Sequence, residues 1–102
     1  MTFTFLYVTA SNEREAKKIA YQLLQKKLVA CANIFPIQSL YWWEGKIKGG
    51  KEMVIILKTM KEKVAFVRKE IENIHSYSIP CITEIAVKPN KQYARWLKEQ
   101  LV

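Results

Sequence analysis

Between residues 31 and 46 the chain reads CANIFPIQSLYWWEGK, beginning at Cys31-Ala32-Asn33-Ile34 and running on to Tyr41-Trp42-Trp43-Glu44-Gly45-Lys46. These residues are mostly strand formers, and the segment stays apolar for longer than an average strand of about 5–6 residues. It therefore predicts one long, bent strand. Pro36 in its middle cannot donate a backbone hydrogen bond, so it marks a bulge, a bend or a sheet edge.

The residues that follow predict a hairpin. Lys48-Gly49-Gly50-Lys51 contains two consecutive glycines, which permit the positive φ angles of a tight turn. The chain then returns as a strand from Glu52 to Lys58, with an apolar centre that shows no alternation, as expected of an interior strand. The resulting hairpin arm is too long for the core of one small subunit to cover, which is a first indication of an oligomer.

The segments on either side predict further strands and amphipathic helices. Thr2 to Thr9 is rich in β-branched and aromatic residues, which favours a strand. Asn12 and Glu15 form a capping-box pattern before an apolar helical stripe that reaches Leu28. Thr59-Met60-Lys61-Glu62 repeats that pattern before a second helix with an apolar stripe to Ile74. After the connection from residue 75 to 80, residues 81–87 predict a fourth strand, and Asn90 precedes a short final helix.

The order of these elements is β-α-β-β-α-β with an extra C-terminal helix, which is the ferredoxin-like pattern. We therefore predict one α+β domain over residues 1–102, a ferredoxin-like sandwich with a long hairpin between its second and third strands. Right-handed crossovers place both long helices on one face of the antiparallel sheet. The other face needs a cover, and large exposed apolar surfaces mark interfaces, so the sheets of sister subunits are expected to pack together.

The net charge and the composition of the chain limit the classes of function that it can have. The net charge of +8 invites a nucleic-acid partner, but the lysines are spread along the chain and there are only three arginines, so solvated helix faces explain the charge better. No apolar run is long enough to span a membrane, and Met1-Thr2-Phe3 lacks the basic start of a signal peptide. We expect a cytoplasmic protein whose two cysteines are reduced thiols, with no membrane and no nucleic-acid partner.

Four motifs, in their order and spacing, resemble the CutA family of divalent-cation tolerance proteins. They are Cys31-Ala32-Asn33-Ile34, Tyr41-Trp42-Trp43-Glu44-Gly45-Lys46-Ile47, Leu57-Lys58-Thr59 and His75-x-Tyr77-x-x-Pro80. The resemblance implies a ferredoxin-like subunit, a tight homotrimer and a role in tolerance of divalent metals, copper especially. It also implies an architecture like that of the PII signalling proteins, whose ligands lie in clefts between subunits. No enzymatic reaction is established for the family.

The chain departs from the family pattern at two positions. Ser76 stands where the family has a proline between the histidine and the tyrosine, which removes a restraint on that loop. Cys81 stands where the family often has a glutamate, and a thiol there favours softer metals such as Cu(I) or Zn.

Three residues are candidate metal ligands: Cys31, His75 and Cys81. Thiolates and imidazole bind copper and zinc well, and a trimer would bring three copies of each together. The alternatives are that the cysteines are inert packing residues and that His75 caps the end of a helix. No CxxC, HxH or HExxH spacing occurs, so any metal site must be assembled in space or between chains.

Further residues are candidates for a cleft or an interface. Lys58 and Glu84 lie on predicted strands, where their charges need partners. Glu44, Lys58, Tyr77 and Glu84 are therefore candidate cleft residues, with structural ion pairs across a trimer interface as the alternative. The candidate trimer-interface residues are Tyr41, Trp42 and Trp43.

These patterns predict a non-enzymatic homotrimer of the divalent-cation tolerance type that binds copper or another divalent metal and requires no cofactor. A Cys31–His75 nucleophilic pair would lack a third, orienting group. The alternative is a PII-like trimeric sensor or interaction protein that binds a small anionic ligand in the cleft between subunits. RNA binding on the open sheet is disfavoured because the aromatic signature of RNA-recognition modules is absent.

Overall fold

The computed structural model describes residues 2–102 and contains four strands, three α-helices and one 3-10 turn. In chain order these elements are β1 (Phe3–Ala10), α1 (Glu13–Gln25), β2 (Cys31–Trp43), β3 (Lys46–Met60), η1 (Lys61–Lys63), α2 (Val64–Ile74), β4 (Ile82–Val87) and α3 (Lys91–Leu101).

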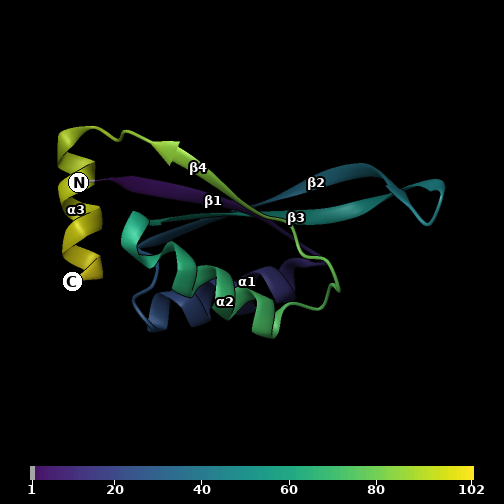
Figure 1. The fold of residues 1–102 in the computed structure, drawn as a ribbon, viewed down its shortest axis with the longest axis horizontal. Coiled ribbons are helices and arrows are strands. Elements are labelled where there is room, and N and C mark those ends of the chain that lie inside the picture. The colour runs from purple at the N-terminus through teal and green to yellow at the C-terminus, as the bar shows by residue number, and fades with distance from the viewer. Residues whose placement is uncertain (1) are drawn as a thin grey trace.

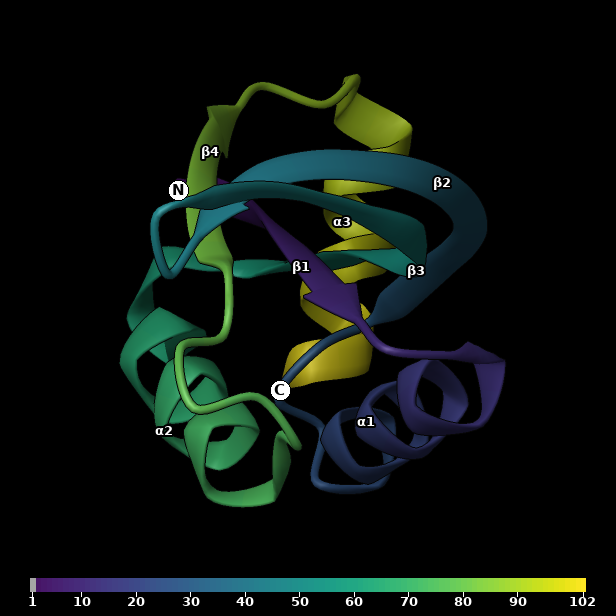
Figure 2. The same cartoon turned by 90° about the vertical axis from the view of Figure 1, so that its right-hand side faces the viewer.

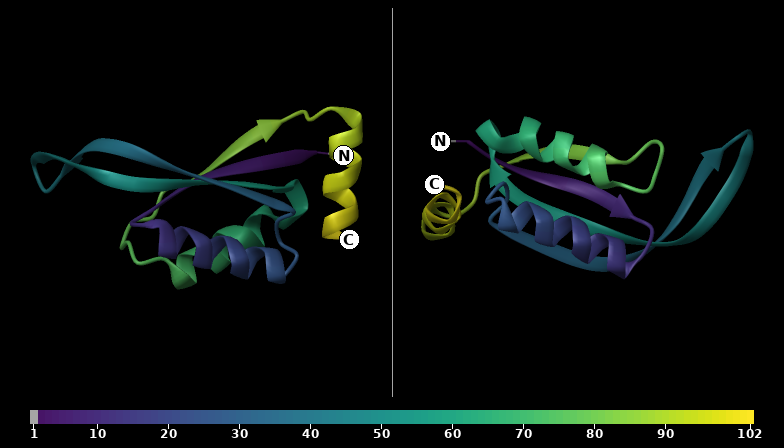
Figure 3. Two further views of the ribbon diagram at one scale, coloured as in Figure 1. Left: turned by 180° about the vertical axis from the view of Figure 1, so that it is seen from behind. Right: turned by 90° about the horizontal axis from the view of Figure 1, so that it is seen from below.

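The strands form one antiparallel sheet in the order β2-β3-β1-β4. Helices α1 and α2 pack side by side on one face, and α3 stands across the end of the sheet where β1 begins (Figures 1 and 3). This arrangement confirms the predicted α+β, ferredoxin-like fold with its extra C-terminal helix. β2 is an edge strand, so the missing N–H of Pro36 costs no hydrogen bond on its outer side. None of the helices in residues 2–102 has the length and apolar character needed to cross a membrane.

The main core lies between the sheet and the two long helices. Alternate residues of β1 point to the helical face, so Leu6 and Val8 are fully buried. The helices contribute the apolar stripes that the sequence predicts. The buried helix residues of this core are Ala16, Ile19, Ala20, Leu23, Val64, Val67 and Ile71.

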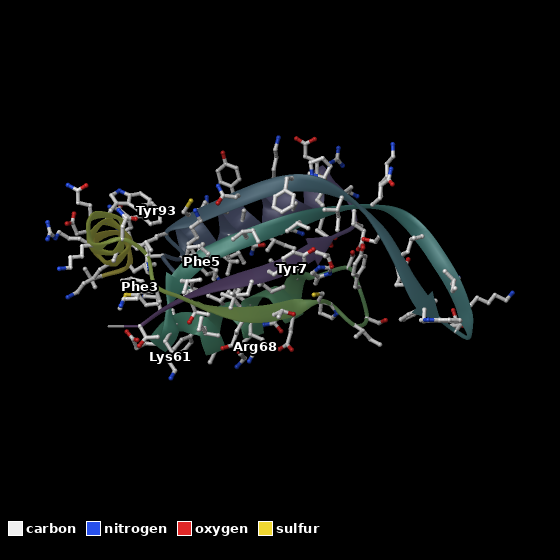
Figure 4. All side chains as sticks on the ribbon, turned by 90° about the horizontal axis from the view of Figure 1, so that it is seen from above. Phe3, Phe5, Tyr7, Lys61, Arg68 and Tyr93 are labelled. Atoms are coloured by element: carbon white, nitrogen blue, oxygen red, sulfur yellow. The ribbon has the colours of Figure 1, made fainter. Side chains whose placement is uncertain are left out.

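The other face of the sheet is mostly uncovered. A second, smaller core of Phe3, Met60, Leu97 and Leu101 lies where α3 meets one end of that face. Figure 4 looks onto the uncovered part, along which Phe5 and Tyr7 follow Phe3 on β1. We call this surface the open face. It is formed by alternate residues that include Phe5, Tyr7, Cys31, Phe35, Ile56, Lys58, Thr83 and Ile85.

The ends of β2 and β3 extend beyond the rest of the sheet as a curved two-stranded arm (Figures 1 and 2). The arm makes the molecule elongated, with extents of 45 × 23 × 21 Å. Its apolar side chains face solvent in the single chain, with Leu40 83%, Trp42 71% and Ile47 66% exposed. An isolated two-stranded ribbon is only marginally stable in water. The exposed apolar surface of the arm is therefore available to pack against a partner.

The hairpin turn lies at Glu44-Gly45, and the prediction of a turn at Lys48-Gly49-Gly50-Lys51 is wrong. Glu44 has φ 49° and Gly45 has φ 76°, and Trp43 pairs directly with Lys46. A two-residue hairpin loop of this kind needs positive φ at both central residues. Gly49 lies within β3, where a Cβ atom would stand 2.8 Å from Leu40 Cδ2, so close approach of the neighbouring strand explains the glycine.

The first predicted capping box is half present, because the Asn12 side chain caps α1 but the Glu15 carboxylate accepts from the Ser11 N–H and not from that of Asn12. The Asn12 side chain accepts a hydrogen bond of 2.9 Å from the Glu15 N–H and begins α1. The prediction at Thr59 is wrong, because its hydroxyl donates instead to the Leu28 carbonyl at 2.6 Å. Thr59 is fully buried between the strand and the α1–β2 connection, and the chain enters α2 through η1 without a side-chain cap.

The position of the turn predicts unequal effects of two glycine substitutions. Gly45→Ala places a Cβ at positive φ and should destabilise the protein by about 1 kcal/mol. Gly50→Ala is the matched control, because Gly50 has free space around it and should be neutral or slightly stabilising. Denaturant unfolding of both variants measures the difference. Equal effects, or a larger cost at Gly50, would contradict the assigned turn.

Candidate functional site

A cleft of about 620 Å³ lies between the arm and the connection from α2 to β4. Its volume is in the range of clefts that hold small molecules. The arm supplies one wall and the connection supplies the other. The side chains that matter below are Tyr41, Trp43, Lys48 and Glu52 from the arm, and Tyr77 and Cys81 from the connection and its end.

Tyr77 and Glu52 meet in this cleft. The Tyr77 hydroxyl donates a hydrogen bond of 2.6 Å to Glu52 Oε2. Burial of the phenol, together with the hydrogen bond to Glu52 and its negative charge, raises the pKa of Tyr77 well above its usual value. Tyr77 therefore stays a hydrogen-bond donor, and Glu52 holds a negative charge at a defined place in the cleft.

His75 positions Tyr77 from inside the protein. Its side chain is fully buried, its Nδ1 accepts the Tyr77 N–H at 3.0 Å, and its Nε2 lies 2.7 Å from the Thr9 carbonyl oxygen. Because Nδ1 accepts, the ring proton must be on Nε2 and is donated to Thr9. Both ring nitrogens are thus occupied, and a metal ion would have to displace one of these hydrogen bonds.

Glu15 ties the same connection to the start of α1. Its carboxylate accepts hydrogen bonds from the backbone N–H and hydroxyl of Ser11, both at 2.9 Å, and from the Ser76 N–H at 2.8 Å. Burial by itself would raise the pKa of Glu15, but these hydrogen bonds from Ser11 and Ser76 outweigh it and lower the pKa to about 2. The connection is therefore held by a charged carboxylate that has no lysine or arginine partner in residues 2–102.

Lys58 lies at the other end of the open face, away from the cleft. Its Nζ is 5.3 Å from the ring centre of Phe5 and 5.2 Å from that of Tyr93, and it donates to the Tyr93 hydroxyl at 3.3 Å. The rings hold the ammonium through cation–π attraction. Cys31 is its direct partner across the β2–β3 ladder, so a half-buried thiol and an ammonium share this end of the face.

The remaining predicted residues are scattered. Glu84 pairs with Arg68 of α2 within the same chain, on the helical side of the sheet. Glu44 forms the turn at the tip of the arm and does not line the cleft. Trp42 is exposed on the arm, whereas its neighbours Tyr41 and Trp43 both line the cleft, as the alternation of a regular strand requires.

The candidate metal ligands do not come together within the chain. In residues 2–102, no group of three or more His, Cys, Asp or Glu side chains could hold a metal ion. Cys31 and Cys81 are both free thiols, the first half-buried beside Lys58 and the second exposed at the cleft. A complete metal site would therefore need ligands from more than one copy of the chain.

Sequence reasoning missed three residues that shape this region: Glu15, Lys48 and Glu52. The sequence indicates Glu15 only as part of a helix cap, although its carboxylate accepts a hydrogen bond from Ser76, 61 residues further along the chain. Glu52 and Lys48 lie four residues apart on β3, so they point to the same side of the strand. That spacing of opposite charges was visible in the sequence, but only the correct turn places both on one strand.

Comparison with known proteins agrees with the resemblance. Residues 4–100 match the family model described as CutA1 divalent ion tolerance protein. The chain is 49% identical over 96 residues to the Divalent-cation tolerance protein CutA of Archaeoglobus fulgidus, covering 93% of this chain and 94% of that protein. It is 39% identical over 98 residues to the protein of the same name from Thermotoga maritima, with 95% and 97% covered.

Solved structures show the same fold. The structure of the periplasmic divalent cation tolerance protein CutA from Archaeoglobus fulgidus superposes with a TM-score of 0.96 at 46% identity, covering 98% of this chain and 99% of that one. That of CutA1 from Oryza sativa also gives a TM-score of 0.96, at 33% identity and with 100% and 95% covered.

The hydrogen bonds that Glu15 accepts from Ser11 and Ser76 predict that the folded protein loses stability in acid. A carboxyl whose pKa is about 2 in the folded protein and near 4.5 when unfolded contributes stability that is fully present above pH 4.5 and is lost as pH falls towards 2. The loss should be on the order of 2–3 kcal/mol. Glu15→Gln should be less stable than the wild type at pH 7 and should show a flatter decline between pH 4.5 and 2. Denaturant unfolding across that range measures the free energy of unfolding of both proteins. An equal dependence of this free energy on pH in the two proteins would contradict the lowered pKa of Glu15.

Proposed function

Since the chain belongs to the CutA1 family of divalent ion tolerance proteins, we propose that it acts in tolerance of divalent metal ions as a non-enzymatic homotrimer. The uncovered apolar surface of the open face and the arm is the observation that supports assembly into a trimer. Phe35 and Ile85 are exposed on the open face, and Leu40, Trp42 and Ile47 on the arm. Burial of such surface between copies is favourable in proportion to its area.

The metal is bound between copies of the chain, with thiols as the principal ligands. Cys31 lies on the open face that assembly would cover, and Cys81 is exposed at the end of the cleft. Thiolates prefer soft ions, which favours copper over the harder divalent cations. His75 contributes to the cleft by holding Tyr77 in place and not as a ligand, because both of its ring nitrogens are engaged. We place the protein in the cytoplasm, where both thiols stay reduced.

A second candidate function rests on the cleft. A PII-like sensor would bind a small anionic ligand there, and Lys48 with the hydroxyl group of Tyr41 would receive it. The resemblance to the CutA family implies that a ligand cleft of this kind lies between subunits. Metal binding would then be incidental to the sensing of a small molecule.

Native mass spectrometry under reducing conditions tests the first candidate. The wild type should appear as a trimer that takes up copper(I) or zinc, and Cys31→Ser should lose the bound ion while remaining a trimer. Cys81→Ser is the matched substitution and reports whether the second thiol is also a ligand. A metal-free trimer would contradict the metal assignment alone, whereas a monomer would contradict the assembly.

Thermal unfolding in the presence of small molecules tests the second candidate. A ligand that binds only the native state raises stability by RT ln(1 + [L]/Kd), about 2.7 kcal/mol at a hundredfold excess over Kd. Among nucleotides and small carboxylates, at least one should raise the Tm of the wild type and raise that of Lys48→Met less. If none of these compounds raises the Tm, the cleft does not bind a small anion.

A further inference from the structure

The cleft is lined by one positive and one negative side chain that do not neutralise each other. Lys48 and Glu52 are the charged groups among its lining residues. Neither forms an ion pair with any partner in residues 2–102. Opposite charges at one site that lack partners of their own are available to a ligand that carries both signs.

The spacing of the two charges separates them along the cleft. Lys48 and Glu52 are four residues apart on the same side of β3, which puts their Cα atoms roughly 13 Å apart at about 3.3 Å per residue. Glu52 lies at the base of the arm near Thr9, and Lys48 lies further out, opposite Tyr41. A ligand that reaches both must have its charged groups at opposite ends of a chain several bonds long.

The negative end is built to hold a cation. One oxygen of Glu52 accepts from Tyr77 at 2.6 Å, and that is the only hydrogen bond to this carboxylate within the described chain, so its second oxygen is free. Tyr77 remains protonated, as argued above, and keeps the carboxylate oriented. Three aromatic side chains, Tyr41, Trp43 and Tyr77, line the same cleft, and ring faces attract organic cations and pack against alkyl chains.

We infer that the cleft binds a small organic zwitterion, with an ammonium group at Glu52, an alkyl chain between the aromatic side chains and an acid group at Lys48. This inference rests on the second candidate function and changes its ligand class, from a simple anion to a molecule with a charge of each sign. The cleft volume of about 620 Å³ has room for such a molecule.

Isothermal titration of the purified full-length protein with three matched probes tests the inference. The probes are 6-aminohexanoate, hexanoate and n-hexylamine, which each contain six carbon atoms and carry both charged groups, the acid alone and the amine alone. The zwitterion should bind more tightly than either single-charge probe, by up to about fivefold, the ratio expected of one added charge pair at a partly exposed site.

Substitutions at Glu52 and Lys48 test which charged group of the ligand each end of the cleft binds. Glu52→Gln should lower the affinity for 6-aminohexanoate to that for hexanoate, and Lys48→Met should lower it to that for n-hexylamine. Lys51→Met removes the same charge from the opposite side of β3 and should leave the affinity unchanged.

The outcomes separate the two proposals. Equal affinity for hexanoate and 6-aminohexanoate would overturn the zwitterion but leave the anion sensor standing. Binding of none of the three probes, together with a negative nucleotide and carboxylate screen, would overturn both. Loss of affinity in Lys51→Met equal to that in Lys48→Met would show a general charge effect and would also overturn the assigned ends.

Discussion

The backbone ladder between β2 and β3 joins thirteen residue pairs, from Cys31 opposite Lys58 to Trp43 opposite Lys46. Because side chains alternate along each strand, this register decides which residues share a surface. It places Cys31 beside Lys58 on the open face, and it aligns Tyr41 and Lys48 on one side of the arm. A turn at Gly49-Gly50 would instead have set Lys58 opposite Tyr41 and shortened the arm. The cleft, the exposed arm and the environment of Cys31 all follow from a turn of two residues at its tip.

The second wall of the cleft is held from the helical side of the molecule. Glu15 lies in the first turn of α1 and accepts from Ser76, while His75 accepts from Tyr77 and donates to Thr9. The His75 side chain is fully buried and the Glu15 side chain is only 11% exposed, whereas Ser76 lies at the surface. Hydrogen bonds to a charged acceptor are stronger than neutral ones. The connection is therefore fixed through its backbone, which keeps Tyr77 within reach of Glu52.

The two thiols of the chain lie in different surroundings, near opposite ends of the open face. At the end near α3, Cys31 and Lys58 lie among the aromatic rings of Phe5 and Tyr93. At the end near the arm, Glu52 and Tyr77 form the polar floor of the cleft, with Cys81 beside them. Lys58 and Glu52 are six residues apart along β3, so the surroundings of Cys31 are separate from the cleft, whereas Cys81 belongs to the cleft.

The sequence by itself determined the identity and order of the elements, the cap of α1 at Asn12, the interior character of β3 and the family, and it limited Pro36 to a bulge, a bend or a sheet edge. These features depend on local backbone preferences and on hydrophobic spacing, which neighbouring residues encode directly. Only the tertiary structure decided where the hairpin turns, that Thr59 bonds to Leu28 instead of capping a helix, that both nitrogens of His75 are occupied, and that Glu52 meets Tyr77. Each of these contacts either fixes a strand register or joins residues far apart in the chain. Packing and the satisfaction of buried polar groups select these contacts, and neither can be predicted from neighbouring residues alone.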